Sequence, residues 1–233
     1  VWAPQAKRVE LLVGAGDSSE SKELEPEAQG YFSGFAPGCA AGDLYRFRLD
    51  GREQLLPDPA SRFQPEGPFG PSMIVDASQF EWHDAQWNGV GLANQVIYEM
   101  HIGTFTMEGT WQAASRQLPE LRKLGVTVLE IMPVNDFCGN FGWGYDGVNF
   151  FAPTRLYGAP DDLRRFVDEA HRAGLAVILD VVYNHAGPTG NFLKDFSKEY
   201  FTDRYENEWG EAINFDGPNS APVREFFLSN AHY

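Results

Sequence analysis

Side chains that could bind a sugar are concentrated in two short segments, residues 136–147 and 180–185. The first segment combines two aspartates with four glycines, a tryptophan and a tyrosine. The second begins with Asp180, which interrupts an apolar run, and ends with Asn184 and His185. Aromatic rings stack on the apolar C–H faces of sugar rings, and carboxylates accept hydrogen bonds from sugar hydroxyls. These residue types therefore favour a carbohydrate-binding cleft.

Each of these residues also has a purely structural explanation. Asp180 could be a hydrogen-bonded carboxylate at the end of a strand, and residues 139–147 could form a flexible turn with buried aromatic rings. His101, at the end of an earlier apolar run, is either a further sugar contact or an interior histidine whose hydrogen bonds are satisfied. Three further carboxylates are interpreted as solvated loop residues: Glu208, Glu211 and Asp216.

Apolar strand runs alternate with helical patterns from residue 95 onward. The runs cover residues 96–102, 126–132 and 176–182, and the helical patterns cover residues 111–124 and 160–173. Strands that are apolar on both faces are typical of parallel sheets covered by helices, either doubly wound or closed into a (β/α)8 barrel. No Gly-x-Gly-x-x-Gly motif directly joins a strand run to a helical pattern, which disfavours nucleotide binding. The pattern therefore favours the first three β/α units of an incomplete (β/α)8 TIM barrel.

Parallel pairing would bring the candidate sugar-binding residues together. Tyr145 follows the second strand run and His185 follows the third, so both are expected side by side at one rim, facing an open cleft. The second helical pattern has consistent boundaries, with Pro160 at its first position and Gly174 just past its end. In the first pattern, Pro119 should kink the helix or mark its true start.

Residues 1–92 show a different pattern, which predicts an antiparallel β-sandwich. Residues 44–49 alternate as a half-buried strand does, and an Asp-Gly turn pair follows them. Residues 57–71 carry five prolines and should run as an extended surface connection. The polar residues 17–23 are interpreted as a loop. The chain is thus divided into a sandwich over residues 1–92 and a barrel part over residues 93–233.

Composition excludes several classes of partner. The chain has 18 Lys and Arg against 33 Asp and Glu, a formal net charge of −15. Nucleic acid and anionic membrane surfaces are therefore disfavoured as partners, and no apolar run approaches the roughly 18 residues of a membrane span. Cys39 and Cys138 lie far apart without a Cys-x-x-Cys pair, which indicates free thiols in a reducing cytoplasm. No cofactor or metal is predicted.

Several motifs resemble the alpha-amylase superfamily, glycoside hydrolase family 13. Residues 180–185 (DVVYNH) resemble its first conserved region, and residues 158–162 with 170–175 resemble the helix before it. Residues 57–72 look like the N-terminal β-sandwich of these multidomain enzymes, a glucan-binding type of module. Within the superfamily, two segments look most like the maltooligosyltrehalose trehalohydrolase group: residues 141–147 (FGWGYDG) and 209–216 (WGEAINFD).

The resemblance implies roles for single residues. Tyr145 matches the aromatic residue that stacks under the glucose ring beside the scissile bond, and His185 matches the histidine that binds the 6-hydroxyl of this sugar. Asp180 matches an aspartate that supports the site, and Asp146 stands where branching enzymes usually carry Gln. Asn184 matches a calcium ligand of many amylases, although no metal is expected in this group. The expected substrate-binding residues are Tyr145, His185, Asp180, Asp146, Trp143 and His101.

The activity implied by the resemblance is that of a retaining glycoside hydrolase, in which one carboxylate attacks the anomeric carbon and a second protonates the leaving oxygen. In the family these residues follow later strands, so they are expected beyond Tyr233, and the 233-residue chain alone is expected to be inactive. The parent reaction would hydrolyse the α-1,4 bond next to the trehalose end of maltooligosyltrehalose. Two alternatives remain open: a 1,4-alpha-glucan branching enzyme and a non-catalytic glucan-binding module.

Overall fold

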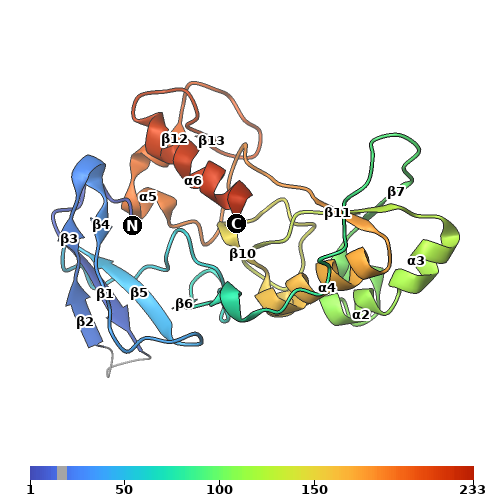
Figure 1. The fold of residues 1–233 in the computed structure, drawn as a ribbon. Coiled ribbons are helices and arrows are strands. Elements are labelled where there is room, and N and C mark those ends of the chain that lie inside the picture. Colours follow the sequence, from blue (N-terminus) through green and yellow to red (C-terminus); the bar gives the residue numbers. More distant parts are fainter. Residues whose placement is uncertain (15–19) are drawn as a thin grey trace.

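The computed structural model describes residues 1–14 and 20–233. Its N-terminal part contains a four-stranded antiparallel sheet in the order β2-β1-β5-β6 (Figure 1). The strands are β1 (Val9–Val13), β2 (Glu20–Glu23), β5 (Leu44–Leu49) and β6 (Ser72–Met73). A separate antiparallel pair is formed by β3 (Glu25–Pro26) and β4 (Phe32–Ser33).

The turn after β5 is confirmed. Asp50 and Gly51 both have positive φ angles, of 51° and 69°, as a tight hairpin turn requires. The loop predicted over residues 17–23 is wrong over residues 20–23, which form β2, and residues 17–19 lie outside the described residues. β2 is an edge strand, where polar side chains remain in solvent, so polar composition did not indicate a strand here.

Much of the layer that covers this antiparallel sheet is helical and comes from the C-terminal part of the chain. Phe47 of β5 packs edge-to-face on Phe196, with ring centroids 6.1 Å apart, and Trp2 packs on Tyr200 at 5.2 Å. The covering elements are α5 (Leu193–Phe196), the 3-10 turn η5 (Lys198–Tyr200) and α6 (Ser220–His232), drawn in orange and red above the sheet in Figure 1. One hydrophobic core therefore combines residues near the start of the chain, such as Trp2, with residues near its end, such as Phe227.

A second sheet holds the three strands predicted from the apolar runs. They are β7 (Ile97–Met100), β8 (Val128–Ile131) and β11 (Ala176–Leu179), and they pair in parallel in the order β11-β8-β7. Each strand is shorter than its apolar run. Ile102 in particular begins α1 (Ile102–Phe105) and does not belong to β7.

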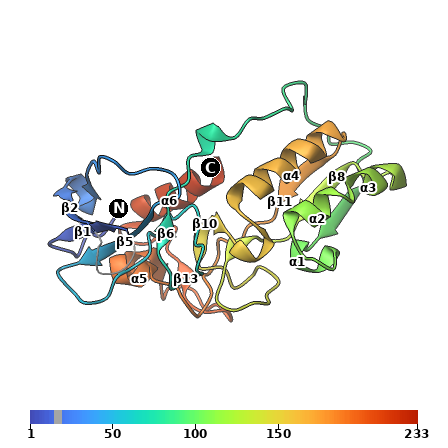
Figure 2. The ribbon, with the colours of Figure 1, turned by 90° about the horizontal axis from the view of Figure 1, so that it is seen from below.

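Three helices cover one face of this parallel sheet (Figure 2). They are α2 (Trp111–Ser115), α3 (Leu118–Leu124) and α4 (Pro160–Arg172). Side chains from alternate strand positions, such as Leu129 and Ile131, form a second core with Trp111 and Phe166 from the helices. The opposite face, which bears Glu99, Glu130 and Asp180, has no covering layer among the described residues.

The helix boundaries follow the local sequence signals. α4 begins at Pro160, and Gly174 follows its end with a φ angle of 75°. Pro119 lies in the first turn of α3. The first helical pattern therefore consists of two helices, as expected if Pro119 marks the start of a helix. Leu124, the last residue of the first helical pattern, is exposed because α3 ends there and Gly125 turns the chain.

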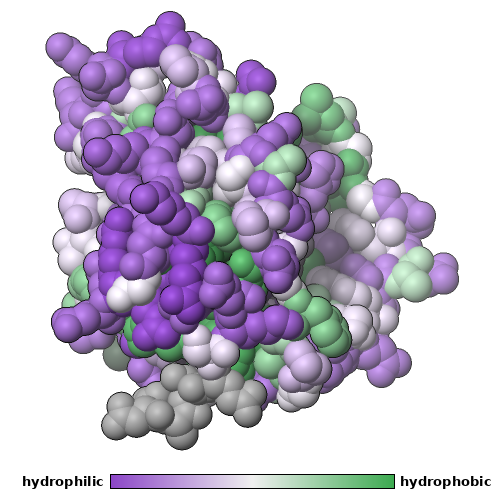
Figure 3. Space-filling model, turned by 90° about the vertical axis from the view of Figure 1, so that its left-hand side faces the viewer, coloured by the Kyte–Doolittle hydropathy of each residue, from purple (hydrophilic) through white to green (hydrophobic). Residues whose placement is uncertain are grey.

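The remaining short elements lie in the connections. β9 (Asn135–Asp136) pairs with β10 (Asn149–Pro153), and β12 (Phe201–Thr202) pairs with β13 (Ala212–Ile213). Three 3-10 turns also lie in the connections of the described residues: η2 (Ala28–Gly30), η3 (Ala77–Gln79) and η4 (Arg155–Tyr157). The end of the molecule that carries the N-terminal sheet is mainly hydrophilic, with small apolar areas between the polar ones (Figure 3). Within the described residues, no helix has both the length and the apolar character to cross a membrane.

Candidate substrate-binding site

Tyr145 and Asp180 meet beyond the carboxyl ends of β8 and β11. The Tyr145 hydroxyl donates a hydrogen bond to Asp180 Oδ2 at 3.3 Å. The Asp180 backbone N–H donates to the Ile131 carbonyl at 2.9 Å, which fixes the end of β11 against β8. Partial burial raises the pKa of the Tyr145 phenol, and the carboxylates of Asp180, Glu99 and Glu130 raise it further. A neutral phenol is thereby held beside an acidic strand end.

Glu99 and Glu130 are part of this acidic surface and were not singled out from the sequence. They lie opposite each other in the register of β7 and β8, and Asp180 follows two positions after the matching residue of β11, Ile178. All three carboxylates therefore share the uncovered face of the sheet. Each glutamate interrupts an apolar strand run, which is the same signal that drew attention to Asp180.

Two glycines let the loop after β8 approach the end of β11. The Gly187 N–H donates to the Gly147 carbonyl at 3.0 Å, and a Cβ atom on Gly187 would lie 2.1 Å from the Asp146 carbonyl oxygen. On the other side, Gly144 has a φ angle of 96°, and a Cβ there would lie 1.9 Å from the Pro133 oxygen. The Asp146 backbone is thus held in a tight contact, while its side chain is exposed.

His185 is buried and does not face an open cleft as expected. Its side chain is 6% exposed, and its Nδ1 lies 3.2 Å from Asn184 Oδ1. The reason is the excursion between β12 and β13, which returns over the strand end. Asn207 donates a hydrogen bond to the Asn184 carbonyl, and the Trp209 ring lies 6.4 Å from the His185 ring.

Trp209 is a candidate sugar-contacting residue that the sequence analysis did not assign. Its side chain is 66% exposed, and it lines an open pocket of about 800 Å³ together with Tyr205 and Asn184. An exposed tryptophan in a polar loop is the signal that could have found it, because large apolar rings are normally covered.

His101 and Trp143 form a second cluster. Trp143 packs against the His101 ring with centroids 4.9 Å apart, and both line a pocket of about 350 Å³. His101 is 9% exposed, and both ring nitrogens have protein partners: Thr104 at Nδ1 and Gly142 with Tyr157 at Nε2. This geometry favours the alternative interpretation of His101 as an interior histidine with satisfied hydrogen bonds.

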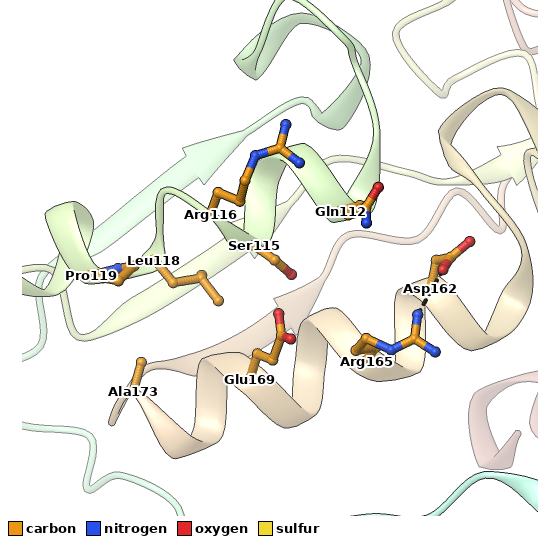
Figure 4. A pocket seen from close by; sticks show the side chains of 9 residues that line it. All are labelled: Gln112, Ser115, Arg116, Leu118, Pro119, Asp162, Arg165, Glu169 and Ala173. Carbon is orange, nitrogen blue, oxygen red and sulfur yellow. Dashed lines mark hydrogen bonds and ion pairs between the residues drawn. The ribbon is translucent and has the colours of Figure 1, made fainter.

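A third cavity, of about 580 Å³, lies between α2, α3 and α4 and contains none of the expected site residues. Polar side chains from the facing helices line it, and Arg165 is already paired with Asp162 at 2.9 Å (Figure 4).

Within the described part of the chain, no three His, Cys, Asp or Glu side chains are grouped as a metal site requires. The structure thus brings Tyr145 and Asp180 into direct contact and keeps His101 with Trp143 in a separate cluster.

Comparison with known proteins shows which family the chain is similar to. The model of the alpha amylase catalytic domain matches residues 71–230. The chain is 45% identical to the malto-oligosyltrehalose trehalohydrolase of Saccharolobus solfataricus, with all of this chain and 40% of the relative covered. It is 49% identical to the enzyme of the same name from Deinococcus radiodurans, with 82% of this chain and 31% of the relative covered.

The fold has close counterparts among solved structures. The crystal structure of a proposed alpha amylase from Salmonella typhimurium superposes with a TM-score of 0.90 at 39% identity, over all of this chain and 40% of that one. The chain therefore spans about two fifths of the length of such relatives. Because the family match covers more than half of its residues, the chain belongs to the alpha-amylase family of glycoside hydrolases.

Proposed function

We propose that the chain forms part of the substrate site of an enzyme that hydrolyses the α-1,4 bond next to the trehalose end of maltooligosyltrehalose and releases trehalose. The observation that carries this proposal is the contact of Tyr145 with Asp180 across two neighbouring parallel strands, in a chain 45% identical to a malto-oligosyltrehalose trehalohydrolase. Tyr145 would stack under the sugar beside the scissile bond, and Asp180 would hold the tyrosine hydroxyl in place.

In this proposal three further residues contribute to the substrate site. His185 and Asp146 lie around the same strand ends, where His185 would donate to a sugar hydroxyl and the exposed Asp146 carboxylate would accept from one. Trp143 would add a second aromatic surface on the same loop, two residues before Tyr145. Residues 93–233 would be the first three β/α units of a (β/α)8 barrel, and residues 1–92 would form a sandwich-type module whose sheet packs on α5, η5 and α6 of that part.

The chemical step needs two carboxylates about 5 to 5.5 Å apart, one as nucleophile and one as acid. We assign neither role to a described residue, and we infer that the 233-residue chain alone does not hydrolyse its substrate. A reducing cytoplasmic location is part of the same proposal and is supported by the free thiols of Cys39 and Cys138.

Turnover is tested with maltotriosyltrehalose as the substrate. The 233-residue chain should release no trehalose, whereas the chain joined to the remaining C-terminal part of the Deinococcus radiodurans relative should release it. Trehalose release by the short chain alone would contradict the proposed inactivity. Formation of new branch points from maltooligosaccharides by the joined protein, without trehalose, would replace the proposal with the branching reaction.

Binding is tested on the chain itself by calorimetric titration with maltotriosyltrehalose. Tyr145→Ala should weaken binding roughly threefold to tenfold, because a stacking ring contributes about 0.5 to 1.5 kcal/mol beyond its burial. Phe35→Ala is the control, since Phe35 is also an exposed aromatic residue, 78% exposed against 43% for Tyr145, and lies in the N-terminal part. Equal loss of affinity in both variants would contradict a specific site at Tyr145.

A further inference from the structure

The loop 139–144 presents two aromatic side chains to solvent. Phe141 is 96% exposed and Trp143 is 60% exposed, so neither ring is held by packing around its full surface. A ring that must stack on a ligand binds more tightly when it is ordered beforehand, because immobilising it otherwise costs conformational entropy. The contacts beneath the loop therefore decide how well these rings are oriented.

Arg155 provides the first contact beneath the loop. Its Nη2 donates to the Gly139 carbonyl at 3.2 Å, and its Nη1 donates to Asp136 Oδ1 at 2.9 Å. Asp136 is fully buried, so the guanidinium is held in place by a carboxylate that cannot turn toward water. The Gly67 backbone also packs against the guanidinium, where a Cβ atom would lie 3.0 Å from its central carbon. The start of the loop is thus tied to a fixed point.

Tyr157 provides the second contact, through His101. The Tyr157 hydroxyl lies 2.8 Å from His101 Nε2, and the same nitrogen lies 2.9 Å from the Gly142 carbonyl oxygen. A carbonyl oxygen only accepts hydrogen bonds, so Nε2 carries the proton and shares it between two acceptors, the Gly142 carbonyl oxygen and the Tyr157 hydroxyl oxygen. Burial raises the pKa of Tyr157 to about 12, so its hydroxyl stays neutral at physiological pH. The Trp143 ring packs against the His101 ring that these contacts orient, with the two planes inclined by 62°.

Both contacts originate from one three-residue turn, η4 (Arg155–Tyr157). The buried Thr154 caps this turn by accepting a hydrogen bond from the Leu156 N–H at 3.4 Å, and α4 begins three residues after it. Arg155 and Tyr157 are on either side of Leu156, so one rigid turn fixes the loop at Gly139 and, through His101, at Gly142.

We propose that Arg155 and Tyr157 are positioning residues that hold the loop 139–144 and thereby orient Trp143 for binding of an α-glucan chain, without touching the ligand themselves. The binding role rests on the proposed function, whereas the orientation of Trp143 does not. The competing explanation is that these contacts stabilise the fold and leave the Trp143 ring and ligand affinity unaffected.

The test uses the 233-residue chain labelled with 5-fluorotryptophan and the variant Tyr157→Phe, which removes one hydroxyl and keeps the ring. The fluorine resonance of Trp143, assigned with Trp143→Phe, should shift or broaden in Tyr157→Phe. The other tryptophan resonances should stay unchanged, except that of Trp111, whose ring packs on Tyr157. The control is Tyr31→Phe, which removes a hydroxyl from a half-buried tyrosine in the N-terminal part and should leave the Trp143 resonance unchanged.

Affinity for maltotriosyltrehalose provides the second readout. Tyr157→Phe should bind roughly threefold to tenfold more weakly than the unaltered chain, and Tyr31→Phe should bind equally well. An unchanged Trp143 resonance with unchanged affinity in folded Tyr157→Phe would overturn the proposal and leave only a stabilising role. If Tyr157→Phe does not fold, Arg155→Lys gives the same readouts, because lysine keeps the charge beside Asp136 but has one nitrogen in place of the fork whose second nitrogen reaches Gly139.

The two proposals fail separately. If the unaltered chain does not bind maltotriosyltrehalose, the proposed function is contradicted, while the Trp143 resonance still reports whether Tyr157 orients the ring. If the chain binds the probe but the Trp143 resonance does not respond to Tyr157→Phe or Arg155→Lys, the positioning proposal alone is overturned.

Discussion

The contact of Tyr145 with Asp180 shows how far single residues could be read from the sequence. Parallel strands end at one rim, so Tyr145 in the loop after one strand was expected beside His185 after the next. The hydrogen bond that Tyr145 makes across these strands is with Asp180, five residues before His185. The burial of His185 was not foreseeable, because it depends on how the excursion between β12 and β13 packs, and this excursion places the Trp209 ring 6.4 Å from the His185 ring.

The raised pKa of Tyr145 gives a prediction for its acidic neighbour. Burial is the main cause of the shift and the negative charge of Asp180 is the next, so Asp180→Asn should lower the pKa of Tyr145 toward its ordinary value without reaching it. The measurement is a spectrophotometric titration from pH 8 to 12, with Tyr145→Phe subtracted to isolate this phenol. A Tyr145 pKa that does not change in Asp180→Asn would show that the two groups are not coupled.

The close approach of Gly187 to Asp146 predicts a large cost for one methyl group. In Gly187→Ala the new Cβ would meet backbone atoms at 2.1 and 2.6 Å, and backbone cannot move aside as a flexible side chain can. Overpacking of this kind costs about 1 to 3 kcal/mol or more of unfolding free energy. Gly91→Ala is the control, because nothing lies within 4 Å of its Cβ position. Equal urea midpoints for the two variants would refute the steric argument.

At the level of elements, local signals placed the ends of α4 well but did not show what lies against it. Two reciprocal pairs tie the connection before β7 to this helix: His83 with Asp168, and Asp84 with His171. Trp87 also stacks on the His171 ring, with centroids 4.8 Å apart and planes inclined by 9°. The partners are more than 80 residues apart in sequence, so no local pattern could reveal them.

A double-mutant cycle on Asp84 and His171 measures the strength of this attachment. The Nδ1–Oδ2 distance is 2.6 Å and both side chains are mostly buried, so we expect a coupling free energy of about 1 kcal/mol from Asp84→Ala and His171→Ala. The exposed pair of Arg116 with Glu108 serves for comparison and should couple by less than about 0.5 kcal/mol. A coupling free energy between Asp84 and His171 no larger than that of the exposed pair would mean that this contact does not hold the connection before β7 against α4.

At the scale of the whole molecule, the hydrophobic cores do not follow the division of the chain at residue 92. One core combines the N-terminal sheet with residues such as Phe196 and Phe227, and the other lies between the parallel sheet and its helices. Sequence patterns identified the antiparallel and parallel strands separately, because periodicity is a local property. Which elements cover the N-terminal sheet depends on tertiary packing, which periodicity does not report.

A fragment of residues 1–92 should therefore not fold by itself. It would keep Phe47 and Leu49 but lose the aromatic side chains of α5, η5 and α6 that cover them. We expect no cooperative thermal transition by circular dichroism and poorly dispersed amide resonances, in contrast to the 233-residue chain. A cooperative transition in the isolated fragment would show that the N-terminal sheet is stable without its helical cover.

The same shared core imposes an order on folding during synthesis by the ribosome. At about 5 to 20 residues per second, Phe227 is added roughly 10 to 35 s after Phe47. Throughout this interval the nascent chain carries apolar residues of the N-terminal part whose packing partners have not all been made, which is the condition under which chains aggregate or bind chaperones. Slow translation between residues 50 and 220 would prolong this exposure, so the yield of folded protein depends on translation speed as well as on the stability of the finished fold.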